Sequence, residues 1–202
     1  MQILAGQYKH RHLLPPPAAA NTRPITSLVK KSVMDTLAGM LNDGVVLDLY
    51  CGTGTLGLEA LSRGARMCYF ADNDAAVVDC LQRNIDSLEG AAARSVVWQG
   101  NVPLRVGGWL ANVGGAVDVA FVDPPYATVR AWDWDEIGRD LLAPIAQRLS
   151  PNGLIVLRTP GKISVPEGLS NLAIWRQRRY GDMRVTMLEN PKPDKPAPAV
   201  EE

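Results

Sequence analysis

The amino-acid sequence predicts an α/β fold in which a mostly parallel sheet is covered by helices on both faces. Apolar runs typical of strands alternate with helical segments between residues 45 and 159, a glycine-rich loop follows the first run, and the chain closes with an antiparallel hairpin. This alternation indicates a parallel sheet, because crossover helices between parallel strands cover both faces. With 202 residues, 47% of them hydrophobic, the chain can bury a sizeable core.

Each element follows from a local pattern of residues. Residues 1–14 predict a small hairpin around Gly6, and after the linker PPPAAAN a helix capped by Thr26 or Ser27 is predicted from apolar residues at helical spacing. The strands are expected at 45–50, 67–72, 94–99, 117–123 and 153–159, and the helices between them at 55–64, 74–88 and 135–150. Two further strands, 172–180 and 183–189, form the closing hairpin.

The chain divides into three predicted regions. Residues 1–25 form a basic hairpin and linker, residues 26–189 form the main domain, and residues 190–202, with four prolines and no apolar cluster, form a disordered tail. Residues 1–34 hold five lysines or arginines and no acid, whereas the rest of the chain has 16 basic residues against 21 acids. A basic segment on an acidic body favours a polyanionic partner, although a solvated segment that is basic by chance has the same composition.

Composition also bears on the setting in which the protein works. No apolar run is long enough to cross a bilayer, and the N-terminal residues lack the pattern of a signal peptide. Cys51, Cys68 and Cys80 form no C-x-x-C pair, which favours a reduced, cytoplasmic setting. His10 and His12 have no neighbouring cluster of cysteines or carboxylates, so we predict that no metal is needed.

The segment DLYCGTGTLG, between the first predicted strand and the next helix, has the pattern of a nucleotide-binding loop. It satisfies G-x-G-x-x-G at Gly52, Gly54 and Gly57. Asp72, at the end of the second strand, can accept hydrogen bonds from a ribose. Asp48 lies four residues before Gly52, where a carboxylate would bind an ammonium group but repel a pyrophosphate. S-adenosylmethionine therefore fits this loop better than a nicotinamide dinucleotide, and a tight turn without a ligand is the remaining alternative.

The stretch FVDPPYATV ends the fourth predicted strand with groups suited to hold an amine on a planar base. In a doubly wound sheet, Asp123 lies beside the glycine loop, in the crevice where such sheets bind ligands. The Asp123 carboxylate and the Pro124 carbonyl can accept two hydrogens of an exocyclic amine, and Tyr126 can stack on the base. These contacts would free the amine lone pair for methyl transfer. The alternative is a proline-rich turn with a surface tyrosine.

The sequence resembles the bacterial small-subunit ribosomal RNA guanine-N2 methyltransferases over most of residues 3–189. The resemblance rests on ILAG, RPIT, VLDLYCGTGTLGLEALSRGA, FADND, DVAFVDPPY and RRYGDMRVTM. It implies a Rossmann-like class I methyltransferase fold, with a seven-stranded, mostly parallel sheet, an antiparallel last strand and a small N-terminal hairpin. It also implies S-adenosylmethionine as the cofactor and a guanine N2 amine of 16S rRNA, in the 30S subunit or an assembly intermediate, as the target.

The predicted site residues fall into three groups. The cofactor-binding residues are Asp48, Gly52, Gly54, Asp72 and Asn101, the last placed near the adenine. The amine-binding residues are Asp123, Pro124 and Tyr126. The RNA-facing residues are Lys9, Arg11 and Arg23. Departures from the family pattern lie mainly in the N-terminal part, and Arg158 stands at the end of the fifth strand where the family often has an acid.

Three other functions share parts of this pattern. A DNA adenine-N6 methyltransferase would use the same acid-proline-proline-aromatic turn on a different amine. A weakly active protein that binds S-adenosylmethionine and assists rRNA assembly would keep the glycine loop without needing Asp123. A nicotinamide enzyme is the least compatible, because of Asp48. We expect no contact with a membrane and no obligate protein partner.

Overall fold

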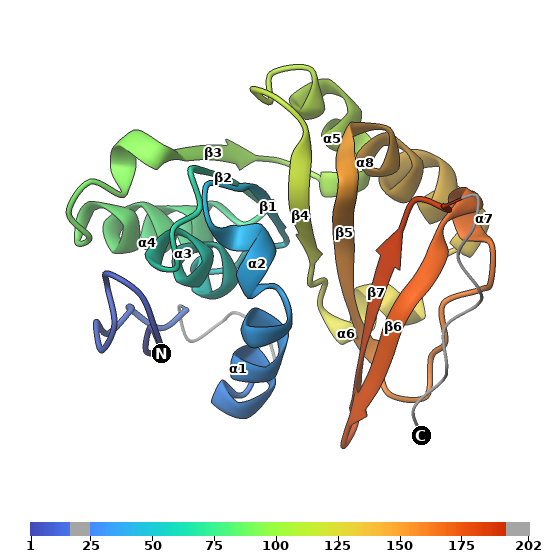
Figure 1. Ribbon diagram of the computed structural model, residues 1–202, viewed down its shortest axis with the longest axis horizontal. Helices are drawn as coiled ribbons and strands as arrows, with labels where there is room; N and C mark the ends of the chain where they lie inside the picture. The colour runs from blue at the N-terminus through green and yellow to red at the C-terminus, as the bar shows by residue number, and fades with distance from the viewer. Residues whose placement is uncertain (17–24, 193–202) are drawn as a thin grey trace.

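The computed structural model describes residues 1–16 and 25–192 and contains a seven-stranded sheet in the order β3-β2-β1-β4-β5-β7-β6 (Figure 1). The strands are β1 (Val45–Leu49), β2 (Met67–Asp72), β3 (Ser95–Gln99), β4 (Val117–Val122), β5 (Leu149–Pro160), β6 (Ala173–Tyr180) and β7 (Met183–Glu189). Strand β7 runs antiparallel to both of its neighbours, and the pairings among β1 to β5 are parallel. The predicted α/β class and the antiparallel last strand are confirmed.

Helices form a layer on each face of the sheet (Figure 1). One layer contains α1 (Ser27–Thr36), α2 (Ala38–Leu41), α3 (Thr55–Ser62) and α4 (Ala75–Asp86). The other contains α5 (Val102–Leu110), α7 (Trp134–Ile137), the π-helical turn η2 (Gly138–Leu142) and α8 (Ala143–Arg148). The short helix α6 (Tyr126–Arg130) follows β4, and two 3-10 turns, η1 (Ala92–Arg94) and η3 (Leu169–Asn171), complete the elements.

Strand β1 shows how the two layers divide the core. All five of its residues are buried, because helices cover the sheet on both sides. Val46 packs with the cluster under α1, α3 and α4, whereas Leu47 and Leu49 pack with the cluster under α5 and α8. Asp48 follows the same alternation, so its side chain lies on the α3 side and accepts a hydrogen bond from Gly57 of that helix. The pleat of β1 therefore places a carboxylate beneath the glycine loop.

Several predicted elements differ from the structure. The helix predicted at 135–150 consists of α7, η2 and α8 in succession, and β5 begins at Leu149, earlier than predicted. Helices α5 and α6 were not predicted, because the sequence VPLRVGGWL of α5 contains a proline and two glycines and α6 is only five residues long. In α5 the proline lies in the first turn, where its missing N–H costs no helical hydrogen bond.

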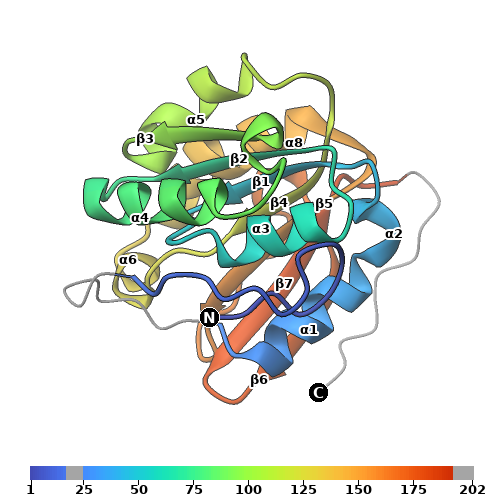
Figure 2. The ribbon, with the colours of Figure 1, turned by 90° about the vertical axis from the view of Figure 1, so that its left-hand side faces the viewer.

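Residues 1–14, called here the N-terminal loop, turn back on themselves as predicted, but they contain one antiparallel bridge, between Gln2 and His12, and no regular strand. The two arms bond to each other, because the Leu13 N–H donates to the Met1 carbonyl at 2.8 Å and the Ile3 N–H donates to the Arg11 carbonyl at 3.0 Å. The backbone of the tip also bonds to α3. The N–H of Gln7 donates to the Ser62 carbonyl at 2.8 Å, and the N–H of Tyr8 donates to Ser62 Oγ at 2.9 Å. Figure 2 shows the loop lying across α3.

The remaining parts of the predicted organisation lie partly outside the described residues. Most of the linker and residues 193–202 of the tail are outside them. Within residues 1–16 and 25–192, no helix is both long enough and apolar enough to cross a membrane. Ile3, Tyr8 and Leu13 of the N-terminal loop belong to the same core cluster as α1, α3 and α4. The division of the chain at residue 25 stays a prediction.

Candidate active site

A pocket of about 300 Å³ lies where β1, β2 and β4 end. Four acids line it, and three of them, Asp48, Asp72 and Asp123, each come from the end of one of these strands. The glycine loop after β1 forms another part of the wall, and Tyr126 and Arg158 complete it beside Asp123. The structure therefore brings the predicted glycine loop and the predicted amine-binding acid into one cavity, as expected at the switch point of a doubly wound sheet.

The glycine loop is held in shape by the two acids beneath it. The N–H of Gly52 donates to Asp72 Oδ2 at 2.9 Å, and the N–H of Gly57 donates to Asp48 Oδ2 at 2.7 Å. Gly54 has φ of 84°, and a Cβ added there would lie 2.4 Å from a methyl carbon of Leu81. Only glycine fits that position. The loop thus has one fixed path between β1 and α3.

Asp48 is almost completely enclosed, with an exposed fraction of 1%. Burial raises the pKa of Asp48 well above its usual range, the hydrogen bond from Gly57 lowers it, and the nearby charges of Asp123 and Asp72 raise it further. A cation in the pocket would oppose this shift by favouring the ionised carboxylate. The role predicted for Asp48 toward an ammonium group stays a prediction, and its role in fixing the loop is visible.

The residues of the pocket fit S-adenosylmethionine. Two buried hydroxyl groups on its wall, Tyr50 OH and Thr53 Oγ1, have no hydrogen-bond partner among the described residues, so both are available to a polar ligand. A Cβ added to Gly52 would meet no atom within 4 Å, which leaves room for a ligand to approach the backbone there. The carboxylates of Asp48 and Asp72 suit a ligand that carries a sulfonium and an ammonium group.

Of the predicted amine-binding residues in the motif after β4, Asp123 and Tyr126 line the pocket and Pro124 does not; the neighbouring Pro125 does. The Asp123 N–H donates to the Leu49 carbonyl at 3.2 Å, which continues the pairing of β4 with β1 and fixes Asp123 beside the glycine loop. Pro125 precedes the first residue of α6, Tyr126, in extended backbone conformation. Burial raises the pKa of Asp123, and the neighbouring Arg158 guanidinium lowers it.

Arg158 belongs to this site and was not predicted to do so. Its guanidinium forms an ion pair with Asp123 and lies 5.6 Å from the centroid of the Tyr126 ring. The sequence contains a signal that could have found it, because Arg158 lies at the end of the predicted strand 153–159. Neighbouring parallel strands bring their C-terminal residues to the same edge, as Asp123 and Arg158 show.

Asn101 is not brought into the pocket. Its side chain is exposed and caps α5, accepting a hydrogen bond from the Leu104 N–H at 3.4 Å. It does not line the cavity described above. The contact with adenine predicted for Asn101 has no support in this geometry, because its amide oxygen already serves as a helix cap.

The predicted RNA-facing residues lie on the N-terminal loop or beyond the described residues. Lys9 and Arg11 are exposed, and a terminal nitrogen of Arg11 donates to the Ser87 carbonyl at 2.8 Å. Arg23 lies outside the described residues. Their contact with RNA stays a prediction. Lys30, counted in the same basic segment, is buried and does not contribute to an exposed charge.

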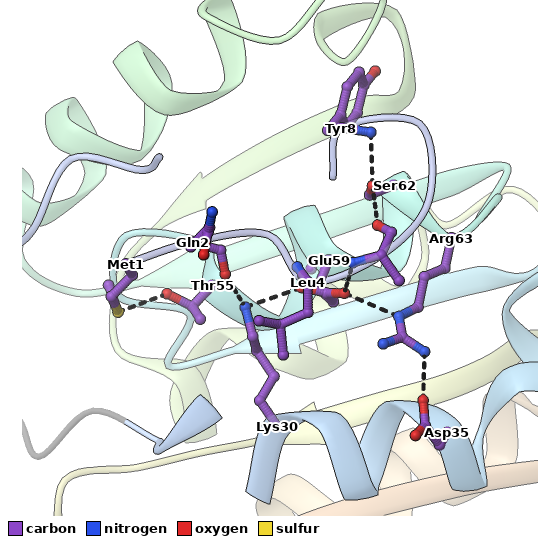
Figure 3. Close-up of polar contacts among 12 residues, drawn as sticks. Met1, Gln2, Leu4, Tyr8, Lys30, Asp35, Thr55, Glu59, Ser62 and Arg63 are labelled. Atoms are coloured by element: carbon purple, nitrogen blue, oxygen red, sulfur yellow. Dashed lines mark hydrogen bonds and ion pairs between the residues drawn. The ribbon is translucent and has the colours of Figure 1, made fainter. Parts of the chain in front are cut away.

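A buried acid, Glu59 of α3, joins the N-terminal loop to the domain (Figure 3). It accepts hydrogen bonds from the N–H groups of Leu4 and Ala5 at 2.8 and 3.0 Å, and it pairs with Lys30 and Arg63, each at 3.0 Å. This junction holds the loop over α3, where Met1 lines the pocket and its sulfur accepts a hydrogen bond from Thr55 Oγ1 at 3.1 Å. Sequence reasoning missed it.

Known proteins resemble this chain over most of its length. The family model described as Conserved hypothetical protein 95 matches residues 1–189. Ribosomal RNA small subunit methyltransferase D of Escherichia coli strain K12 is 30% identical over 195 residues, covering 94% of this chain and 89% of that protein. YlbH of Bacillus subtilis, which carries an rRNA methyltransferase name, is 30% identical over 183 residues, covering 90% and 94%.

A solved structure extends the comparison from sequence to fold. The protein yhhF of Escherichia coli, described as a methyltransferase, superposes with a TM-score of 0.71 at 27% identity, covering 94% of this chain and 97% of that one. Its similarity, the strand order and the place of the pocket agree on one architecture. The chain belongs to the family described as Conserved hypothetical protein 95, together with the small-subunit rRNA methyltransferases D, and has the class I methyltransferase fold.

Proposed function

We propose that this protein transfers a methyl group from S-adenosylmethionine to the exocyclic N2 amine of a guanine in 16S rRNA, in the 30S subunit or an assembly intermediate. The observation that carries the proposal is the shared pocket of the glycine loop and the Asp123 motif. A methyl donor and an amine acceptor must lie together for direct transfer, and this pocket is lined by residues suited to each.

The predicted cofactor-binding residues of the pocket each offer the cofactor a different contact. Gly52 leaves its backbone open to the cofactor, and Asp48 and Asp72 supply negative charge at the ends of β1 and β2. Asp72 already accepts the Gly52 N–H, yet an ionised carboxylate has about four acceptor positions, so a ribose hydroxyl can still donate to it. Tyr50 and Thr53 offer their hydroxyls to the same ligand.

The amine-binding residues make the N2 amine, which is a poor nucleophile, more reactive. The lone pair of an N2 amine is delocalised into the base, and it becomes available when the amine turns pyramidal. Asp123 and the Pro124 carbonyl accept the two amine hydrogens, which favours that geometry and stabilises the positive charge that develops on nitrogen. Tyr126 stacks on the base and aligns the nitrogen with the methyl group. Bound cofactor would supply that methyl on a sulfonium, which becomes a thioether as its S–CH3 bond breaks and the N–C bond forms. The methylated nitrogen then loses one proton, which the Asp123 carboxylate hydrogen-bonded to it can accept.

The identity of the substrate rests on the relatives. Two curated proteins that carry rRNA methyltransferase names match most of this chain, and one of them names the small subunit. With ribosomal RNA as substrate, we expect the protein to act in the cytoplasm, without contact with a membrane and without an obligate protein partner. The three cysteines are all free, which suits a reducing compartment.

The proposal is tested by asking which nucleic acid is methylated and where. Purified protein is incubated with labelled S-adenosylmethionine and naked DNA, undermethylated 16S rRNA or 30S particles, and modified nucleosides are identified by mass spectrometry. We expect N2-methylguanine in the RNA substrates. N6-methyladenine in DNA would identify the other amine methyltransferase instead.

A substitution separates catalysis from assistance in ribosome assembly. Asp123→Ala should lower kcat by about 10²- to 10³-fold, because it removes an acceptor aimed at charge that develops during transfer. Cofactor affinity, measured by calorimetry, should stay close to that of the unaltered protein. If Asp123→Ala fully rescues the growth phenotype of a deletion strain, assembly and not methylation is the cellular role.

A further inference from the structure

We propose that Arg158 occupies the place of the target base in the free protein, pairing with Asp123 and covering Tyr126, until the amine of the base displaces it. The inference rests on the proposed function, because it assigns the same two contacts to the base. It adds a positioning residue that acts through Asp123 and whose own movement precedes transfer.

Strand register creates the pair. Val122 of β4 lies opposite Leu157 of β5, so the next residue on each strand, Asp123 and Arg158, lie side by side at the end of the sheet. Arg158 Nε donates to Asp123 Oδ1. The two side chains are only 9% and 15% exposed, so water competes little for this contact. The pair is therefore part of the closed wall of the pocket.

The guanidinium imitates a base in shape as well as in hydrogen bonding. It is planar and lies over the Tyr126 ring, with Cζ 5.6 Å from the ring centroid. An N–H that donates to Asp123 and a flat group that rests on Tyr126 are the two contacts that the proposed function requires of a guanine. Because both are already made by Arg158, the base and the guanidinium are alternative occupants.

The surroundings make Arg158 the counter-ion of Asp123. Four acids line the pocket, Asp48, Asp72, Asp74 and Asp123, and Arg158 is the one lysine or arginine among the described residues that line it. On the other side of the pair, a small hollow is lined by apolar side chains from Ile25, α1, α3 and the sheet. Among the described residues, no lysine or other arginine lines either cavity beside Asp123, so loss of Arg158 without a substitute donor would leave a buried charge uncompensated.

The size of the cavity agrees with such a movement. Its volume of about 300 Å³ is at the lower limit of sites that hold one small molecule. Direct transfer needs cofactor and base in the site together. Departure of the guanidinium from Asp123 and Tyr126 frees space next to the two groups that the base must contact. When the amine of the base takes the place of the guanidinium, Asp123 again accepts a hydrogen bond from a donor.

The test compares Arg158→Met, which removes charge and planarity, with Arg158→Lys, which keeps the charge. Arg105→Met, an exposed arginine on α5, is the matched control. At a pH where Asp123 is ionised, Arg158→Met should lower KM for RNA by at least about threefold, because a competing occupant is gone. A rise in KM would show that Arg158 binds the RNA directly and would overturn the proposal.

The second readout is the pH profile. Removal of the neighbouring cation raises the pKa of Asp123, so the acidic limb of kcat/KM should move upward by about one to three pH units in Arg158→Met. Arg158→Lys and Arg105→Met should leave it close to the original position. An unshifted limb in Arg158→Met would exclude the counter-ion role. If that variant does not fold, as judged by cofactor calorimetry, Arg158→Leu, which also lacks charge, planarity and a donor, carries the same expectations.

A third readout needs no substrate. The carboxyl ¹³C resonance of Asp123, assigned with Asp123→Asn, is titrated in the unaltered protein and in Arg158→Met without RNA. We expect a higher midpoint in the variant, and equal midpoints would overturn the inference. Absence of methylation by the unaltered protein would instead count against the proposed function and leave this titration unaffected.

Discussion

Glu59 and Lys30 form an ion pair with an N–O distance of 3.0 Å that is closed to solvent at both ends, with exposed fractions of 0% and 3%. Lys30 Nζ also donates to the Gln2 carbonyl at 2.7 Å, so the pair links α1, α3 and the N-terminal loop. Burial lowers the pKa of Lys30, and the negative charge of Glu59 opposes this shift by raising the pKa. The contact holds together segments that are far apart in the sequence.

Removing the charge of Glu59 should destabilise the protein strongly. Glu59→Gln leaves the buried Lys30 without its partner charge, and breaking a buried pair from one side costs about 3–5 kcal/mol. Urea unfolding followed by circular dichroism measures the change. Lys31→Ala is the control, because the Lys31–Asp35 pair is 66% and 47% exposed and should contribute less than about 1 kcal/mol. Equal losses in the two variants would contradict the assignment.

The tip of the N-terminal loop requires glycine at position 6. Gly6 has φ of 82°, and an added Cβ would lie 1.7 Å from the Ser62 carbonyl oxygen. Gly6→Ala should therefore cost at least about 1–2 kcal/mol of unfolding free energy, from backbone strain alone, and detach the tip from α3. Gly39→Ala is the matched control.

The control has the opposite expectation, because an added Cβ at Gly39, in α2, meets no atom within 4 Å. Alanine inside a helix is favoured over glycine by about 0.5–1 kcal/mol. Both variants are compared by thermal unfolding, with hydrogen exchange of the Tyr8 amide as a local probe. Unchanged protection of that amide in Gly6→Ala would show that the tip tolerates a side chain.

Asp48→Asn should stabilise the protein at neutral pH while weakening cofactor binding. The pKa of Asp48 is raised in the folded state, so its contribution to stability is present below its unfolded value and lost as pH rises through the folded value. Asparagine keeps an acceptor for the Gly57 N–H and removes the charge. The melting temperature should rise by about 2–4 °C for each kcal/mol gained.

The pH dependence and the affinity supply the checks on Asp48. The advantage of Asp48→Asn over the unaltered protein should shrink toward acidic pH, where both side chains are neutral. Calorimetry should show weaker binding of S-adenosylmethionine, because the positive ligand loses a nearby carboxylate. An unchanged affinity of Asp48→Asn for S-adenosylmethionine would show that Asp48 only holds the glycine loop in shape.

Asn101→Ala separates a helix cap from a ligand contact. If the side chain only caps α5, the variant should lose about 1 kcal/mol of stability with an unchanged dissociation constant for S-adenosylmethionine. Asn101→Ser, which restores a capping oxygen, should recover the stability. A weaker cofactor affinity in both variants would restore the contact with adenine that the sequence suggested.

The predictable parts of the protein are those that a local pattern of neighbouring residues determines. The glycine loop and the Asp123 motif each lie at the end of an apolar strand, and strand alternation was enough to bring them to one edge. Arg158 and Glu59 depend on register and on packing between distant segments, which a local pattern does not contain. Asn101 follows a strand as expected, but its side chain accepts a hydrogen bond from the Leu104 N–H and does not line the pocket.

The N-terminal loop differs from a regular two-stranded hairpin for a related reason. Its arms pair with each other at Met1 and Leu13 and at Ile3 and Arg11, whereas the N–H groups between them bond to Glu59 and Ser62 of α3. The part of the loop that lies on the helix depends on a buried carboxylate more than fifty positions away. Local strand propensity carries no information about that partner.

The seam between β1 and β4 also orders events during synthesis of the chain. The glycine loop and the acids under it are complete by residue 72, and the N-terminal loop has its partners on α3 and α4 and at Arg94. Asp123 and Arg158 emerge later from the ribosome. With translation at about 5–20 residues per second, the cofactor half precedes the amine half by seconds. Pairing of β1 with β4, in which Val46 lies opposite Val119, brings the glycine loop and Asp123 to one pocket.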